Sequence, residues 1–499
     1  DNTRAKFDTA SFSYAISLSD KAASFENKEN YKDVVTVGSM VVNSDEPRTP
    51  MDEAREYLDV GEMAYASNGY RLAEVSLIAS AIILEADGQQ NHPIFSRNMA
   101  DLGMLYNSMG RYGLSEEFTR RALELRKELR GEESLDYAAS LNNLGVLNQN
   151  RGNYNEAEKE LTQAINLNKQ VAGAESLPYA IALNNRGVLY QILGRYESAE
   201  EDMLAGLKVA ALNMKPNSSQ FTRLQSNLAL LYQQQGEYEK AETIFKAAIN
   251  TIGRNPLKSK KTNPDYAHMA ENLASLYVLM GKYTDAEELY KEAITVYARK
   301  FGTTYSGYGL AMARLASMYR QTQRLEEADQ MLTQAYSIII QAYGPQHPVT
   351  VDTQTELALL NWSQGNLTEA GDYFEQALDA SLEFIGAYFA PMSESEKAAY
   401  WKTLQPRFEK YFSFIAAHKE AAAALEKALD YRLATKAMLL SSTTKIKKHI
   451  LASGDSELIA DYETWLDQKE LLAMYYNVSA EDIKEQKVNI DSLELVVNT

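Results

Sequence analysis

The 499-residue chain contains no cysteine, which excludes disulfide bonds, thiolate nucleophiles and zinc sites with cysteine ligands. Histidine is scarce as well, and no histidine stands in an HExxH motif or another paired metal-ligand spacing. The G-x-S-x-G nucleophile motif and the G-x-x-x-x-G-K-S/T phosphate loop are also missing. We therefore predict no catalytic residue, no metal site and no cofactor in these residues. The histidines are His92, His268, His347, His418 and His449.

Long apolar runs are absent too. No stretch approaches the roughly 18 apolar residues of a membrane-spanning helix, so we expect no insertion into a membrane. The 50 Lys and Arg residues are outnumbered by 68 Asp and Glu residues, which gives a formal net charge of −18. This negative charge repels phosphate backbones and anionic membrane surfaces, so nucleic acid is not an expected partner. With only 11 prolines and 45% hydrophobic residues, the composition is that of a folded protein.

A small residue returns at nearly constant intervals along the chain. The steps between its eight occurrences are 42 residues, apart from one step of 45. A second small residue follows 12 positions later, and an aromatic residue stands 9 positions after the first in six of the eight repeats. His92 and His347 occupy the same position before their repeats, which predicts that they begin helices rather than share a metal ion. The eight positions are Gly61, Gly103, Gly145, Gly187, Ala229, Ala274, Ala316 and Ala358.

The repeat explains a glycine in an unfavourable place. Gly145 lies inside a predicted helix, where glycine costs about 1 kcal/mol relative to alanine. Two antiparallel helices joined by a tight turn can pack closely only where small side chains meet, and we expect Ala157 to face Gly145. Gly152 is predicted to end the first helix in a left-handed conformation. Asn155, followed by Glu158, is predicted to open the second helix as a capping box.

The stretches LGVLNQNRGNYNEAEKEL and LASLYVLMGKYTDAEELY resemble the tetratricopeptide repeat (TPR). The period of 42 exceeds the usual length of about 34 residues. With segments such as HPIFSRNMADLG and NPDYAHMAENLA before the small residue, it resembles the kinesin-light-chain-like kind. The resemblance implies an all-α, right-handed superhelical α-solenoid of helix pairs. It implies eight repeats over residues 54–384, after an N-terminal helical cap over residues 1–53 in which a divergent repeat is weakly marked.

Residues 385–499 lose the period but keep helical patterns, and Ser393 and Glu396 are spaced as a capping box before a dense aromatic segment. One interpretation is a helical cap that covers the open end of the solenoid. The blocks MSESEKAAYWKTLQPRFEKYFSF and LDYRLATKAMLLSSTTKIKKHILASGDSELIADYETWLDQKELLAMYY also resemble the linker that joins tetratricopeptide repeats to a CHAT domain in bacterial proteins. CHAT domains are caspase-like peptidases with a His–Cys dyad, and no catalytic residue can be carried over to this cysteine-free chain.

Asparagine recurs on the predicted first helices, which line the concave face in solenoids of this kind. An amide offers donors and acceptors together, so it can bond the backbone of an extended peptide without reading side chains. In tetratricopeptide proteins, matching asparagines often hold such peptides. The alternative is that they bond adjacent helices, and the sequence leaves both open. Glutamines one turn further on are predicted to extend this polar floor or to be ordinary solvated residues. The candidates are Asn142, Asn143, Asn184, Asn185, Asn227, Asn272, Gln149, Gln191 and Gln233.

The leading hypothesis is a non-enzymatic scaffold that binds a protein or an extended peptide, as the recognition or regulatory part of a longer TPR–CHAT protein. A C-terminal domain of the same protein would then be a further partner. The alternatives are a passive structural adaptor in a multiprotein complex and the substrate-presenting part of a caspase-like peptidase whose catalytic domain lies beyond residue 499. The lack of cysteine and the non-Met first residue fit an exported bacterial protein, and a cytoplasmic location stays open.

Overall fold

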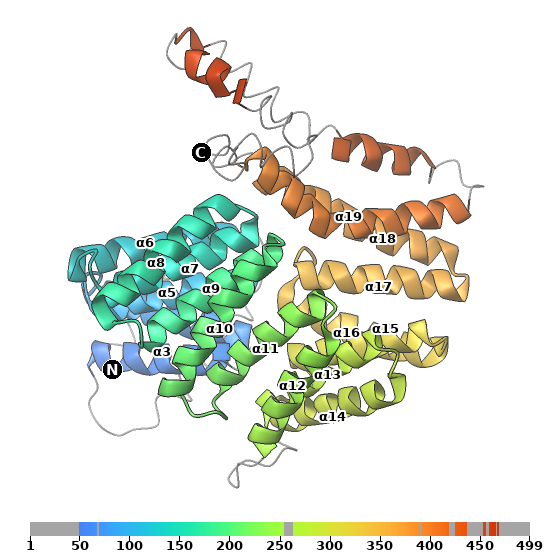
Figure 1. The fold of residues 1–499 in the computed structure, drawn as a ribbon, viewed down its shortest axis with the longest axis horizontal. Helices are drawn as coiled ribbons and strands as arrows, with labels where there is room; N and C mark the ends of the chain where they lie inside the picture. The colour runs from blue at the N-terminus through green and yellow to red at the C-terminus, as the bar shows by residue number, and fades with distance from the viewer. Residues whose placement is uncertain are drawn as a thin grey trace, which may run out of the picture. The chain divides into compact units, whose positions relative to one another are not determined.

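The structure is a computed structural model that describes residues 49–66, 69–253, 263–389, 392–418, 425–436, 453–455, 459–465 and 467–468. Throughout these ranges the regular elements are α-helices, joined in most places by short turns (Figure 1). The chain divides between Ala377 and Leu378 into two compact units, unit 1 and unit 2. None of the described helices is both long and apolar enough to cross a membrane.

Unit 1 is a row of helix pairs, in which the helices from α3 to α16 pack against their partners and each pair packs against the next. This arrangement confirms the predicted solenoid. The first pair begins at Pro50, and residues 1–48, which hold most of the predicted N-terminal cap, lie outside the described residues. Within the described residues the pairs are α3 (Pro50–Ala66) with α4 (Tyr70–Ala86), α5 (Pro93–Ser108) with α6 (Tyr112–Arg130), α7 (Leu135–Arg151) with α8 (Tyr154–Ala172), α9 (Leu177–Ile192) with α10 (Tyr196–Asn213), α11 (Ser219–Gln234) with α12 (Tyr238–Gly253), α13 (Pro264–Leu279) with α14 (Tyr283–Phe301), α15 (Ser306–Gln321) with α16 (Leu325–Tyr343), and α17 (Pro348–Gln364) with α18 (Leu367–Tyr388).

The small residues of the repeat stand where the two helices of a pair cross. A Cβ atom added at Gly145 would lie 2.7 Å from Leu161 Cγ and 3.3 Å from the carbonyl oxygen of Ala157. A Cβ atom at Gly103 would lie 2.3 Å from Thr119 Oγ1. The close crossing therefore requires glycine in these pairs and outweighs its low helix propensity.

The turn after α7 is also built as predicted, but the start of the second helix, α8, is not. Gly152 adopts a left-handed conformation with φ of 85°, and its N–H donates to the carbonyl of Gln149. The second helix begins at Tyr154, directly after Asn153 as N-cap, and the predicted capping box at Asn155 is therefore wrong. The turn at Gly152 and Asn153 lets the helix begin one residue before Asn155, so Asn155 lies within the helix and cannot be its N-cap.

Successive pairs are braced by a tyrosine that the sequence analysis did not single out. It lies three positions after the small residue of a first helix, and its hydroxyl donates to a glutamate on the preceding second helix. Basic side chains form ion pairs with several of these glutamates, and Arg324 holds the pKa of Glu287 at about 2. The bonded pairs are Tyr106–Glu74, Tyr190–Glu158, Tyr232–Glu200, Tyr277–Glu242 and Tyr319–Glu287, with O···O distances of 2.6 to 3.0 Å.

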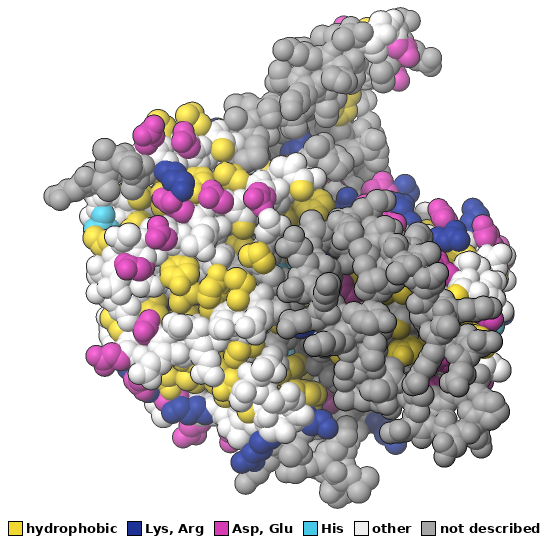
Figure 2. Space-filling model, turned by 180° about the vertical axis from the view of Figure 1, so that it is seen from behind, with side chains coloured by type: hydrophobic (Ala, Val, Ile, Leu, Met, Phe, Trp, Pro, Cys, Tyr) yellow, Lys and Arg dark blue, Asp and Glu magenta, His cyan; other side chains and the backbone are white. Residues whose placement is uncertain are grey.

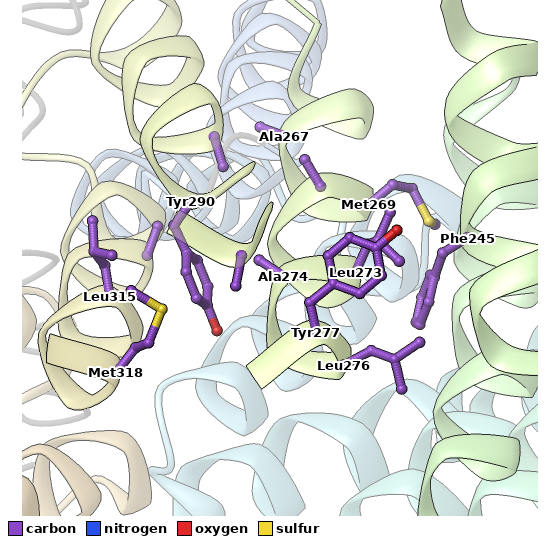
Figure 3. Close-up of a cluster of buried hydrophobic side chains, with 14 of the residues drawn as sticks. Phe245, Ala267, Met269, Leu273, Ala274, Leu276, Tyr277, Tyr290, Leu315 and Met318 are labelled. Atoms are coloured by element: carbon purple, nitrogen blue, oxygen red, sulfur yellow. The ribbon is translucent and has the colours of Figure 1, made fainter. Parts of the chain in front are cut away.

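The apolar core of unit 1 runs from one pair into the next. Figure 3 shows part of it, where Phe245 of α12 approaches Met269 and Tyr277 of α13. Further along, Tyr290 of α14 and Leu315 of α15 belong to the same cluster. The apolar side chains of each pair thus belong to a core that is shared with the neighbouring pairs. The stability of unit 1 therefore depends on every pair having its neighbours in place.

Unit 2 is organised around α19 (Glu394–Ala417), whose predicted capping box is confirmed. Ser393 Oγ accepts from the N–H of Glu396, and the Glu396 carboxylate accepts from the N–H of Ser393. Tyr411 is fully buried and meets Tyr431 of the helix at residues 425–436 edge to face. The predicted aromatic segment therefore forms an interior. The unit boundary falls within α18, and most residues after 436 lie outside the described residues.

Candidate functional site

The first helices of neighbouring pairs contact one another directly, from α3 and α5 through to α15 and α17. On the opposite side the second helices can diverge: between α4 and α6 lies a cavity of about 570 Å³, lined by Ile78, Ile82, Glu117 and Arg121 among others. A row of pairs curves toward the side on which its helices converge. We call this side, formed by α3, α5, α7, α9, α11, α13, α15 and α17, the inner face.

Hydrogen bonds between asparagines connect three successive first helices, α7, α9 and α11, across the inner face. Asn185 Nδ2 of α9 donates to Asn142 Oδ1 of α7 at 2.9 Å, and Asn227 Nδ2 of α11 donates to Asn184 Oδ1 of α9 at 3.2 Å. Each bond joins a residue two positions before the small residue to a residue three positions before it on the preceding helix. We call the predicted asparagines the amide row: Asn142, Asn143, Asn184, Asn185, Asn227 and Asn272.

Asn143 differs from the rest of the amide row. The position on α5 that would accept its hydrogen bond is occupied by Ala100, whose methyl group cannot do so, and Asn143 bonds no other described residue through its side chain. It is partly exposed. By contrast, Asn184 and Asn272 are each only 5% exposed, and Asn272 Nδ2 donates to Ser226 Oγ at 2.9 Å. Asn184 and Asn272 thus fit the structural alternative, while the amide of Asn143 has its full bonding capacity.

A second line of amides runs one turn further along the same helices. Gln191 Nε2 of α9 donates to Gln234 Oε1 of α11 at 2.8 Å. Gln149 is 8% exposed and Gln233 is half-buried. Their Oε1 atoms are buried and accept no hydrogen bond from any described residue. The three predicted glutamines therefore lie on helices of the amide row. In two of them, Gln149 and Gln233, the side-chain oxygen accepts no hydrogen bond from a described residue.

Ionisable side chains stand in place of the asparagines on the helices before and after the amide row. Beyond it, Arg314 Nη1 of α15 pairs with Glu271 Oε1 of α13 at 3.0 Å, at the same two positions of the repeat as Asn185 and Asn142. Before it, Asp101 of α5 lies beside Glu62 of α3. Burial, and then the charge of Glu62, raises the pKa of Asp101 to about 7. The sequence marks Asp101 and Arg314 only as breaks in the asparagine series, although a spacing of 43 residues identifies the partner of Arg314.

The centre of the inner face carries little charge, although the protein is acidic. On the face that Figure 2 shows, the described Asp and Glu side chains lie scattered among apolar and uncharged ones. On α7 and α9 the inner positions hold amides and the half-buried Val146 and Val188. A surface of this kind can bond peptide groups and contact small apolar side chains.

Two of the histidines, His92 and His347, stand at helix starts. The Nδ1 atoms of His92 and His347 accept the N–H groups of Ile94 and Val349, each at 3.2 Å, at the starts of α5 and α17. This confirms the predicted role at helix starts. Across the part of the chain that the structure describes, no three His, Asp or Glu side chains are grouped to hold a metal ion.

The tetratricopeptide repeat family matches residues 96–170, 139–211, 220–299, 265–341 and 309–383. A Podosopora anserina protein described as a kinesin light chain with nearly identical TPR-like repeats is 21% identical, over 42% of this chain and 97% of that chain, with a TM-score of 0.35. BtubC (BKLC) from P. vanneervenii is 19% identical, over 51% and 92%, with a TM-score of 0.36. A Rap protein complexed with competence and sporulation factor is 13% identical, over 78% and 99%, with a TM-score of 0.47. No curated protein matches the chain.

Proposed function

Because the chain belongs to the tetratricopeptide repeat family, whose scaffold is typical of protein–protein interaction, we propose that its inner face binds an extended peptide segment of a partner protein. The family match confirms the resemblance seen in the repeat residues. No enzyme family is indicated for this region. In this proposal the chain recognises its partner and catalyses no reaction.

The observation that carries the proposal is the unpaired amide of Asn143. A side-chain amide held on a rigid helix can donate to one peptide carbonyl and accept from one peptide N–H. Asn142 and Asn185, also partly exposed, lie next to it with capacity beyond the single bond between them. Val146, one turn along α7, offers a small apolar contact beside these amides. This combination suits the backbone of an uncharged, extended segment.

The test begins with selection of binding peptides from a library of random peptides displayed on phage, using the full chain. The selected peptide is then titrated against Asn143→Ala. Loss of two hydrogen bonds should weaken binding about tenfold, at about 0.5–1.5 kcal/mol for each bond. The matched control is Asn166→Ala, which removes an exposed asparagine from α8, on the other side of the helix pair.

We expect the control to bind as the unsubstituted chain does. Equal affinity for Asn143→Ala and the unsubstituted chain would overturn the proposed use of the inner face. It would favour the alternative, a passive adaptor that holds its partners through the second helices.

We propose further that the chain is the recognition or regulatory part of a longer TPR–CHAT protein. The sequence blocks after residue 392 support this, and the interior of unit 2 would give a following domain a firm attachment. The mass of the protein as its native host makes it tests the proposal. A mass well above 55.9 kDa is expected, and a mass near that value would remove the peptidase from the function. The peptidase alternative requires in addition that the longer protein cleaves its bound partner.

A further inference from the structure

Two parts of unit 1 that lie far apart in the sequence are in contact. Tyr70, at the start of α4, and Tyr343, at the end of α16, have their ring centroids 5.7 Å apart. The ring of Tyr343 in turn stacks on the ring of His347, with the centroids 4.5 Å apart. The first pair of the solenoid therefore meets the junction between its seventh and eighth pairs.

His347 makes the second part of this contact. Its Nε2 atom lies 3.3 Å from the carbonyl oxygen of Ser108, at the end of α5. Because Nδ1 accepts the N–H of Val349, the ring proton stands on Nε2, which donates to Ser108. Burial lowers the pKa of His347 to about 4, so the ring is neutral near pH 7, as these two bonds require.

The role of His347 in starting α17 does not explain this contact. His92 starts α5 in the same way, and Asn263 starts α13 through Oδ1, which accepts the N–H of Asp265 at 3.0 Å. An asparagine would therefore serve as the N-cap equally well. What the ring of His347 adds is the bond from Nε2 to Ser108.

Gly110, the glycine that faces His347, also differs from the residues at the equivalent turns of other repeats. Gly110 has φ of 70°, and a Cβ atom there would lie 2.8 Å from Cδ2 of His347. Gly194 occupies the equivalent turn with φ of 75°, but a Cβ atom there would meet nothing within 4 Å. Gln323 occupies another equivalent turn with φ of 63°, so the turn itself accepts a side chain. At Gly110 the ring of His347 leaves no room for one.

We propose that Tyr70, Ser108 and Gly110 on one side and Tyr343 and His347 on the other form a latch, which closes the superhelix around the inner face and opens to admit the partner segment. The admission step rests on the proposed function, whereas the latch itself does not. Pairs of a solenoid otherwise hold only their neighbours, so small changes at each junction add up and can separate its distant parts. The hydrogen bond from His347 to Ser108, the hydrogen bond between the side chains of Tyr70 and Tyr343, and a few ring contacts are together weak enough to break and re-form as the pairs shift.

The latch is tested first without any ligand. The chain has no cysteine, so Met63→Cys on α3 and Gln341→Cys on α16, both at exposed positions, provide two unique sites for spin labels. In the chain that carries only these two labels, the measured distance between them should be mainly short, as expected for a closed latch. Adding His347→Asn, which keeps the N-cap and removes the Nε2 donor, should raise the long-distance population about fivefold. Adding His92→Asn, the matched change at α5, should leave the distribution unchanged. Equal distributions for the two variants would overturn the latch.

The admission step is tested by locking the contact. A Cβ atom at Gly110 would lie 3.6 Å from Cγ of His347, so cysteines at both positions are within reach of a disulfide. The oxidised Gly110→Cys, His347→Cys chain should bind the selected peptide at least about tenfold more slowly than after reduction. A Gly194→Cys, His347→Cys chain should show no such difference. Equal rates in the oxidised and reduced chain would overturn the admission step, whatever Asn143→Ala does to affinity.

Discussion

The inner face uses the same two positions of the repeat in two different ways. Between α7 and α9 they hold Asn142 and Asn185, which share a single hydrogen bond at 2.9 Å. Between α13 and α15 they hold Glu271 and Arg314, which form an ion pair at 3.0 Å. Glu271 also accepts from Tyr297, and burial has removed it almost entirely from water. The repeat determines which positions meet, while the residue types decide whether the contact leaves bonding groups for a ligand.

Removing the acid of the ion pair should have the largest effect on stability. Glu271→Ala would remove the ion-pair partner of Arg314 and the acceptor of the Tyr297 hydroxyl, and we expect the free energy of unfolding to fall by about 3 kcal/mol. Glu271→Gln, which keeps an acceptor but not the charge, should cost less. Urea unfolding of the full chain measures both. If the two variants were equally unstable, the charge rather than the hydrogen bonds would be responsible.

Replacing Asp101 of α5 by asparagine, which extends the amide row onto this helix, should stabilise the protein at pH 8. The pKa of Asp101 is raised from 3.8 to about 7, so between these values the folded chain holds a proton that the unfolded chain has lost. The free energy of unfolding therefore falls as the pH rises through this range. Asp101→Asn cannot titrate and should be more stable at pH 8 by on the order of 2 kcal/mol, with little change at pH 4.

The matched control for Asp101→Asn is Asp59→Asn, which changes the exposed residue at the equivalent position of α3. Urea unfolding at several pH values should show no comparable gain for it. A gain at pH 8 that persisted at pH 4 would contradict the assigned role of the Asp101 proton.

The smallest expected effect separates two neighbouring members of the amide row. Asn185→Ala removes the donor to Asn142 and the acceptor of Asn184 Nδ2, and should lower the free energy of unfolding by about 1 kcal/mol. Asn143→Ala removes no bond to a described residue and should change it by less than about 0.5 kcal/mol. Parallel denaturation curves measure the difference. Equal losses would mean that Asn143 supports the fold as Asn185 does.

Much of the fold follows from local chemistry and was predictable. Gly145 and its equivalents reveal the helix crossings, Gly152 marks the end of a helix, and Ser393 with Glu396 marks the start of α19. The capping box predicted at Asn155 failed because the turn geometry starts the helix at Tyr154. Propensity patterns locate a helix better than its first residue, since the turn before it decides where the first hydrogen bonds form.

The candidate site was predicted in outline only. The asparagine series identified the inner face, but it treated Asn143 and Asn185 as equivalent. Their difference depends on the preceding helix, where Ala100 or Asn142 stands opposite. That relation appears in the sequence only as a spacing of 43 residues, one more than the repeat.

The sequence by itself determined the helix pairs, their turns and the row in which they pack, because each of these depends on residues within one repeat or the next. Only the tertiary structure decided that Gly110 meets His347. That contact joins residues more than 200 positions apart, and it depends on the small rotation at every junction between them. The total rotation over all these junctions cannot be deduced from any one residue or repeat. The latch contact can therefore be identified only in the complete tertiary structure.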